Sequence, residues 1–151
     1  MLTALGLIGV VALIAANGYF VAVEFAFVAA RRSRFLEQAH EGDRRAKRAI
    51  DVHKRLGFML SGAQLGITVT TLALGFIAEP AIASVFAPVL EAAGVPDSAS
   101  LGIALVLALV FVTMAQMVFG ELAPKNLAIA RPEPVARALA PSTWIFMRVA
   151  G

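Results

Sequence analysis

The sequence lacks cysteine, and long stretches of it lack cations. With no cysteine among 151 residues, disulfides, thiolate metal sites and thiol catalysis are all excluded. Only 15% of the residues are charged, and the stretch from Glu79 to Ser100 contains neither lysine nor arginine. These absences remove the cysteine-based classes of enzyme and metalloprotein, so the apolar residues must define the fold.

Apolar residues make up 60% of the chain, and its mean hydropathy of +0.83 is far above that of a soluble domain. Three apolar runs are long enough to cross a bilayer as helices. They cover residues 2–30, 57–78 and 101–119, and Glu79-Pro80 closes the second. The sequence therefore predicts an all-α, polytopic membrane protein with three transmembrane helices.

The cations are concentrated in one segment. Nine of the thirteen lysine and arginine residues lie between Arg31 and Arg55. A helix-compatible pattern predicts one or two short juxtamembrane helices over 31–55, broken near Gly42, and a solvated charged loop is the alternative. Because basic loops stay in the cytoplasm, we expect this segment to be cytoplasmic and the N-terminus to lie outside the cell membrane.

The chain after the third run is less regular. We expect an interfacial helix over 126–140, interrupted by Pro132 and Pro134. The last apolar piece, 138–151, is too short to span by itself. It is predicted to be an interfacial helix, a re-entrant helix or the first part of a truncated fourth span.

The most informative motif is Gly120-Glu121-Leu122-Ala123-Pro124-Lys125, at the end of the third run. Pro124 has no N–H, so it leaves the Gly120 carbonyl free beside the Glu121 carboxylate. A helix that ends or kinks here also directs its negative dipole end to the same place, which favours a cation. The alternative is a plain helix end, with Glu121 at the interface and the Lys125 side chain extending to the headgroups.

Polar side chains share one face of each apolar run. These faces hold Asn17 and Glu24 on the first run, Gln64, Thr68, Thr71 and Gly75 on the second, and Thr113, Gln116 and Gly120 on the third. Three such faces can converge on one site. Small and hydroxyl residues also permit close helix packing in lipid, which needs no ion.

The carboxylates are harder to explain by packing, because neither Glu24 nor Glu121 has a cation within its run. Hydrogen bonds from Gln64 or Tyr19, or protonation, are the alternative for Glu24. The available oxygen ligands suit Mg²⁺, Ca²⁺ or Na⁺ rather than zinc or copper. The predicted metal ligands are Glu121, the Gly120 carbonyl, Gln64 and Thr68, with Asn17 and Glu24 beside them. Both histidines, His40 and His53, lie in the charged segment and are expected to be solvated.

Four ordered blocks cover nearly the whole chain. They are 17–28 (NGYFVAVEFAFV) with 30–34 (ARRSR), 64–68 (QLGIT), Leu74-Gly75 with Glu79-Pro80, and 120–125 (GELAPK) with Leu127-Ala128, Pro132-Glu133 and Val135-Ala136. Together they resemble the CNNM/CorC transmembrane domain, also called DUF21, whose bacterial members are often named haemolysin-like.

The resemblance implies a dimeric Mg²⁺ transporter of the plasma membrane that exports Mg²⁺ in exchange for Na⁺. It implies that Glu121 holds the central cation together with polar groups of the first two spans. It also implies cytosolic CBS-pair and CorC-type domains, which are absent from these residues and through which alone nucleotide would act.

The sequence departs from the family pattern at one place. Members with the eukaryote-like pattern carry serine and asparagine in the first span and paired asparagines in the second. Here these places hold Val21, Glu24, Ala63 and Gln64, which makes Glu24 a candidate additional ligand or sodium site.

Two classes of function compete. The first is a transporter that binds Mg²⁺ or Na⁺ in the membrane, and the second is a membrane-anchored regulatory or scaffold protein that binds cations without net transport. An enzyme is not expected, because no cysteine or histidine accompanies the carboxylates of the spans. The expected partners are the lipid bilayer, Mg²⁺, Na⁺ and a second copy of the chain, and no nucleic acid.

Overall fold

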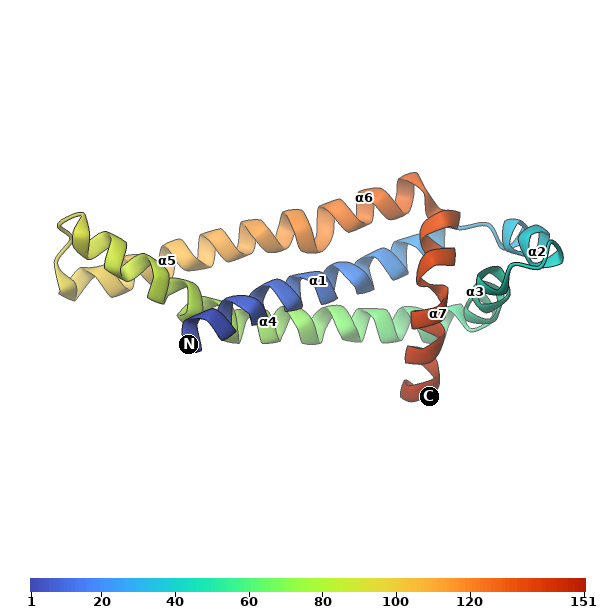
Figure 1. The fold of residues 1–151 in the computed structure, drawn as a ribbon, viewed down its shortest axis with the longest axis horizontal. Helices are drawn as coiled ribbons and strands as arrows, with labels where there is room; N and C mark the ends of the chain where they lie inside the picture. Colours follow the sequence, from blue (N-terminus) through green and yellow to red (C-terminus); the bar gives the residue numbers. More distant parts are fainter.

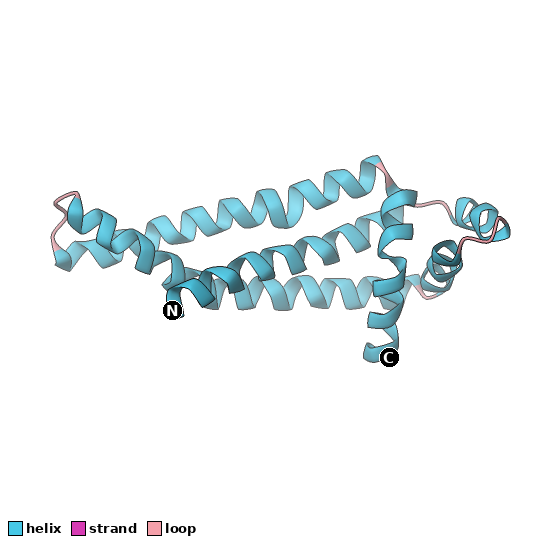
Figure 2. Cartoon of the chain, viewed as in Figure 1, coloured by secondary structure: helices cyan, strands magenta, loops and turns pink.

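The computed structural model describes residues 1–151, apart from the side chain of Leu2. The described chain is helical and contains no β-strand (Figure 2). Three helical rods run side by side: α1 (Leu2–Ala29), α4 (Leu56–Ala92), and the continuous series α5 (Asp97–Ala115), η1 (Gln116–Leu122) and α6 (Ala123–Ala130) (Figure 1). Each rod is long and apolar enough to cross a membrane. The predicted all-α, polytopic membrane protein is thereby confirmed.

Helix α4 is longer than the sequence predicted. It does not end at Glu79-Pro80 but continues to Ala92 with Pro80 and Pro88 inside it, and its second half changes direction (Figure 1). A proline removes one backbone hydrogen bond and kinks a helix. The helix persists here because Ala78 and Ile82 remain buried against α5. The chain then turns at Gly94, whose φ of +89° is easily reached only by glycine.

The third rod also continues past the point where a break was predicted. Instead of ending at Gly120-Glu121, the chain widens into the π-helical segment η1 and then resumes as α6. The amide of Ala123 bonds the carbonyl of Val118, five residues back. Pro124 stands within the first turn of α6, where a missing N–H is tolerated. A local widening thus replaces the expected helix end.

The basic segment forms two short helices, α2 (Arg32–His40) and α3 (Arg44–Lys54). The chain reverses between them at Gly42, whose φ is +95°. Here the predicted pair of helices broken near Gly42 agrees with the structure. The expectation of two solvated histidines is only half right, since His40 is exposed but His53 is half-buried beside Phe35. Burial, assisted by the nearby Arg32 charge, lowers the pKa of the His53 imidazole.

The interruption expected at Pro132 is present, since the chain breaks at Arg131 between α6 and α7 (Pro132–Ala150), but Pro134 does not interrupt α7 and the helix continues past residue 140. Arg131 adopts φ −138° and ψ 64°, outside the helical region, and the following Pro132 disfavours a helical conformation at that position. Helix α7 crosses one end of the bundle instead of running along it (Figure 1). Its buried Ala136, Ala140 and Met147 pack there. This placement favours the interfacial alternative for residues 138–151.

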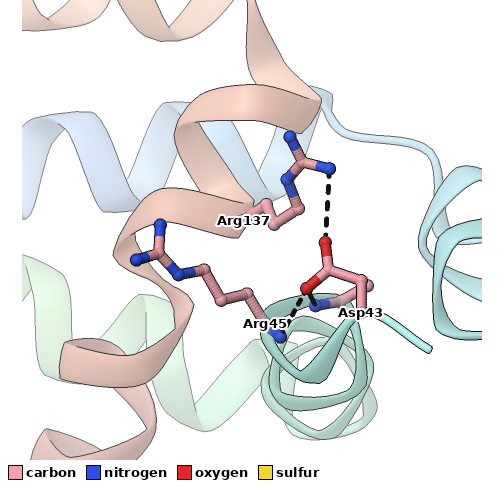
Figure 3. A network of polar contacts seen from close by, with 4 residues as sticks. Asp43, Arg45 and Arg137 are labelled. Carbon is pink, nitrogen blue, oxygen red and sulfur yellow. Dashed lines mark hydrogen bonds and ion pairs between the residues drawn. The ribbon is translucent and has the colours of Figure 1, made fainter.

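An ion pair joins α3 to α7 (Figure 3). Asp43 caps α3 by accepting from the Arg45 amide at 2.8 Å, and its other oxygen lies 3.2 Å from Arg137 Nη1. Burial alone would raise the pKa of the Asp43 carboxyl. The amides of Arg45 and Ala46 and the Arg137 guanidinium outweigh burial and lower the pKa. Asp43 therefore stays ionised and fixes α7 against the juxtamembrane helices.

Two apolar clusters flank the middle of the bundle. One contains Val10, Leu74, Ala104 and Ala108 and joins α1, α4 and α5. The other surrounds Phe27, where α1 meets the juxtamembrane helices and α7. Between them along α1 lies Asn17, which is completely buried. The buried polar side chains Asn17, Thr70 and Gln116 thus lie between two apolar layers.

Candidate cation site

Asn17 of α1 is the centre of a polar cluster that joins all three rods. Its Nδ2 donates to the carbonyl of Gly120 in η1 at 2.9 Å. Its Oδ1 accepts from the hydroxyls of Thr70 at 2.9 Å and Thr71 at 3.3 Å, both in α4. The carbonyl that cannot receive a bond from Pro124 is therefore bonded by a side chain from another helix. We call Asn17, Thr70, Thr71, Gln116 and Gly120 the polar cluster.

Small residues let the backbones approach closely enough for these bonds. A Cβ at Gly18 would lie 3.3 Å from the Phe119 carbonyl and 3.5 Å from Pro124 Cγ, so α1 touches η1 and α6 directly. Any larger residue at Gly18 would push the two helices apart. A shift of this kind would lengthen the hydrogen bond from Asn17 to Gly120, which is at its best distance of 2.9 Å.

The widened turn of η1 explains why Gln116 and Gly120 both face the cluster. The buried face of this rod repeats every four residues, at Ser100, Ala104, Ala108, Val112, Gln116 and Gly120. In an α-helix of 3.6 residues per turn, this spacing drifts by about 40° at each step. A π-helical turn contains more residues and reverses the drift. The two polar positions are thereby kept on the core side.

Gln116 is the unsatisfied member of the cluster. Its side chain is 7% exposed, and neither its amide oxygen nor its amide nitrogen has a hydrogen-bond partner among the described residues. It lies over Gly120, where an added Cβ would come within 2.7 Å of Gln116 Oε1. Buried amides without partners are rare in folded proteins, and their usual explanation is a functional role or a bound water or ion.

Glu24 and Gln64 form a second polar contact, two turns along α1 from Asn17. Gln64 Nε2 donates to Glu24 Oε1 at 3.3 Å, in an exposed position. Tyr19, the other donor considered for Glu24, is instead bonded to Ser142 Oγ at 2.9 Å on α7. The Gln64 alternative for Glu24 therefore matches the geometry, and the Tyr19 alternative does not.

Glu121 and Thr68 lie outside both groups. The Glu121 side chain is exposed and has no hydrogen bond to any residue that the structure describes. One residue on a helix turns the side chain by about 100°, so Glu121 cannot share the direction of Gly120. The Thr68 hydroxyl is exposed and bonds the Gln64 carbonyl in its own helix at 3.0 Å. Of the six predicted ligands, side-chain hydrogen bonds between different helices join Asn17 to Gly120 and Gln64 to Glu24.

A groove of about 440 Å³ runs along α4 to the edge of the cluster. It is lined by Thr71, Leu72, Gly75, Phe76 and Glu79. Thr71 belongs both to this groove and to the cluster, since its hydroxyl bonds Asn17. Glu79 lies two turns away at the other end. The groove therefore places Glu79 on the same exposed surface of α4 as Thr71, the member of the cluster that lies at the groove.

The possible metal ligands of the polar cluster are mostly neutral oxygen atoms. Among the described residues, no group of three histidine, aspartate or glutamate side chains converges as a metal site. The polar cluster offers the Gly120 carbonyl, two amides and two hydroxyls. Such ligands hold hard cations through dipoles, and Na⁺, Mg²⁺ and Ca²⁺ prefer them over softer ligands.

Sequence reasoning missed Thr70 and did not select Gln116 as a ligand. Gln116 was visible as part of the polar face of the third run. Thr70 was not visible in this way, because it does not lie on the helix face that Gln64, Thr68 and Thr71 share. The antiparallel register of α1 and α4, which brings Thr70 opposite Asn17, is a tertiary feature.

The chain is similar to known proteins along almost its entire length. The family model described as "Cyclin M transmembrane N-terminal domain" matches residues 8–151. The chain is 44% identical over 140 residues to "UPF0053 protein MT1890" of Mycobacterium tuberculosis, which covers 93% of this chain and 31% of that protein. It is 42% identical over 140 residues to "UPF0053 protein YhdT" of Bacillus subtilis, covering 93% of this chain and 30% of the relative.

A cyanobacterial protein is similar at a lower sequence identity. "UPF0053 protein sll0260" of Synechocystis is 33% identical over 132 residues, which is 86% of this chain and 29% of that protein. The chain thus spans less than a third of the length of these three relatives.

Proposed function

Since this chain belongs to the CNNM (cyclin M) transmembrane family, we propose that it is the membrane domain of a Mg²⁺ transporter in the plasma membrane. In this proposal the protein exports Mg²⁺ in exchange for Na⁺, acts as a homodimer and has no catalytic activity. The observation that carries the proposal is the buried polar cluster around Asn17, whose Gln116 amide has no partner among the described residues. Polar groups at this depth in a membrane protein usually mark an ion pathway.

The hydrogen bonds of Asn17 suggest how a cation would enter the cluster. A half-turn of its amide would direct Oδ1 toward the Gly120 carbonyl and Nδ2 toward the Thr70 hydroxyl. Thr70 can accept this bond, because its single proton can go to the Gly66 carbonyl at 2.8 Å. Asn17 Oδ1, Gly120 O and Gln116 Oε1 would then be three oxygens available to one ion. The rotation leaves the Gly120 carbonyl and Asn17 Oδ1 without a hydrogen-bond donor, and the cation would take the place of that donor.

The carboxylates would act at the margins of this site. Glu79, at the far end of the α4 groove, would attract a cation toward Thr71. Glu121 is exposed and points away from the cluster, so its full negative charge would attract the cation from outside the set of neutral ligands. Glu24, bonded to Gln64, would serve as a separate position for Na⁺. Mg²⁺ keeps its waters tightly, so a small number of well-placed oxygens with several retained waters is the expected mode of binding.

Proteoliposomes made with the full-length protein provide the test. We expect Mg²⁺ flux that depends on an opposing Na⁺ gradient, and the Glu121→Gln variant should reduce this flux to the level of protein-free vesicles. Glutamine keeps the shape but removes the charge. Thr68→Val should reduce the flux less, since it removes one neutral hydroxyl. Glu41→Gln removes the same charge from the exposed turn between α2 and α3 and serves as the control. Normal flux in Glu121→Gln would mean that this carboxylate has no part in transport.

One observation favours the second candidate function, a membrane-anchored regulatory or scaffold protein. Asn17 and Gly120 satisfy each other at 2.9 Å, and such bonds between helices also stabilise bundles that move no ion. Isothermal titration of the full-length protein with MgCl₂ separates the two functions when combined with the flux assay. Binding without flux at any Na⁺ gradient would support the scaffold.

A further inference from the structure

A polar cavity lies where α1 leaves the apolar part of the bundle. Its volume is about 490 Å³, within the range of small-molecule sites. Its lining comes from the end of α1, from α2 and from the start of α7, and comprises Ala29, Arg31, Arg34, Gln38, Pro132 and Glu133. Because α1 is apolar enough to span the membrane up to Ala29, this cavity stands at the level of the lipid headgroups.

The lining carries a net positive charge and exposed cations. Arg31 and Arg34 are both exposed, and Glu133 is the single acidic side chain among the lining residues. Glu133 accepts from the Arg31 amide at 3.4 Å, and Arg34 lies 3.5 Å from Glu37 in an exposed pair of little strength. The two guanidinium groups therefore remain available to a phosphate, which they bind through charge-assisted hydrogen bonds.

The cavity also holds an acceptor that needs a donor. The Oε1 atom of Gln38 is buried and has no hydrogen-bond partner among the described residues. A phosphate alone cannot satisfy it, because phosphate oxygens are acceptors too. Once the Gln38 side chain turns its amide toward the cavity, a hydroxyl group on the same ligand can donate to Oε1 while the phosphate meets Arg31 and Arg34.

We propose that this cavity binds the headgroup of an anionic phospholipid that carries hydroxyl groups, such as phosphatidylglycerol. The single negative charge of that headgroup balances the net charge of the lining, formed by Arg31, Arg34 and Glu133. Its glycerol hydroxyls supply the donor for Gln38. Its acyl chains continue into the bilayer beside Ala29. A soluble anion has no such chains and cannot make this contact. The lipid thereby joins α1, α2 and α7 at the membrane surface.

The test uses the full-length protein and native mass spectrometry, with dioleoyl-phosphatidylglycerol and dioleoyl-phosphatidylcholine added in turn. We expect phosphatidylglycerol to bind about tenfold more tightly than phosphatidylcholine, which has the phosphate but no donor. Arg31→Gln combined with Arg34→Gln should weaken phosphatidylglycerol binding by about tenfold or more. Arg44→Gln combined with Lys47→Gln removes the same charge from exposed positions of α3 outside the cavity and should leave binding unchanged.

Two further measurements identify the chemical groups of the ligand that the cavity recognises. Gln38→Leu should lower the preference for phosphatidylglycerol over phosphatidylcholine to the part that the charge difference supplies, and leave the binding of phosphatidylcholine as it is. Inorganic phosphate at millimolar concentration should not displace the lipid. Displacement by inorganic phosphate, equal binding of the two lipids by the unmodified protein, or unchanged binding in the double arginine variant would each overturn the proposal.

Discussion

At the scale of single residues, Asn17 holds the three rods together through three polar partners, one in η1 and two in α4. Its amide bonds the Gly120 carbonyl, and its oxygen receives two threonine hydroxyls. Asn17→Leu keeps the volume but leaves the Gly120 carbonyl without a donor in a region that excludes water. We expect the free energy of unfolding to fall by about 1–2 kcal/mol.

The measurement is unfolding of the purified protein in bicelles by titration with a denaturing detergent. Thr71→Val is the matched control, because it removes only the longer, 3.3 Å bond to the same oxygen. Thr71→Val should lower the free energy of unfolding by only about 0.5 kcal/mol. Equal losses in both variants would show that Asn17 is not the central link.

Gln116 offers a prediction that separates ion binding from packing. Because its amide has no partner among the described residues, Gln116→Leu should leave the stability unchanged or raise it slightly. If the amide oxygen contributes to the cation site, the same variant should reduce Mg²⁺ flux by about tenfold, the effect of losing one neutral ligand. Flux in proteoliposomes and unfolding in bicelles are measured on the same preparation. Unchanged flux would assign Gln116 to packing alone.

The contacts between individual residues of the candidate site are what the sequence predicted least well. The missing N–H of Pro124 correctly indicated that the Gly120 carbonyl needs a partner other than the helix. The sequence could not show that the partner is Asn17, since that contact depends on how closely α1 approaches η1 at Gly18. Glu121 and Gly120 are adjacent in the chain, yet they point in different directions on a helix. Adjacency therefore suggested a shared ligand set that the geometry separates.

At the scale of elements, hydrophobic run length predicted the rods, and proline was a poor guide to their ends. Pro80, Pro88 and Pro124 all lie inside continuous helical rods, whereas Pro132 follows a true break at Arg131. The difference lies in what surrounds each proline. Packing of Ala78 and Ile82 maintains α4, and the wider turn of η1 accommodates the chain before Pro124. At Arg131 the next residues instead cross to pack on α1 and α3, so the helix ends.

The link between α3 and α7 gives a prediction at the same scale. Asp43→Ala removes both the helix cap and the ion pair and should lower the free energy of unfolding by about 1–2 kcal/mol. Asp43→Asn keeps a capping oxygen and removes only the charge. Arg137→Gln breaks the same pair from the other side. These two variants should therefore match each other, with losses of about 0.5–1 kcal/mol.

The pH dependence has a definite sign. The pKa of Asp43 is lowered in the folded protein, so its contribution is fully present above the ordinary aspartate pKa and is lost as the pH falls through the lowered value. Thermal unfolding in detergent at pH 7 and near pH 3 measures this change. The advantage of the unmodified protein over Asp43→Asn should be smaller at the acidic pH, and an undiminished advantage there would contradict an ionic contribution.

At the scale of the whole molecule, the distribution of cations and the arrangement of the rods give one topology. The three rods place the α2–α3 segment and the turn before α5 at opposite ends of the bundle (Figure 1). The first end carries nine of the thirteen cations, and the stretch from Glu79 to Ser100 carries none. The positive-inside rule then predicts a cytoplasmic α3 and an external turn.

Because the chain has no cysteine, a single introduced cysteine reports its side of the membrane without further changes. Arg45→Cys on α3 and Ser98→Cys at the start of α5 both lie at exposed positions. In intact cells, a membrane-impermeant maleimide should label Ser98→Cys and should label Arg45→Cys only after the membrane is opened. The reason is electrostatic, since moving nine cations across the bilayer is far less favourable than moving the uncharged turn residues. Labelling of both variants from the same side would contradict three membrane crossings between the N-terminus and Lys125.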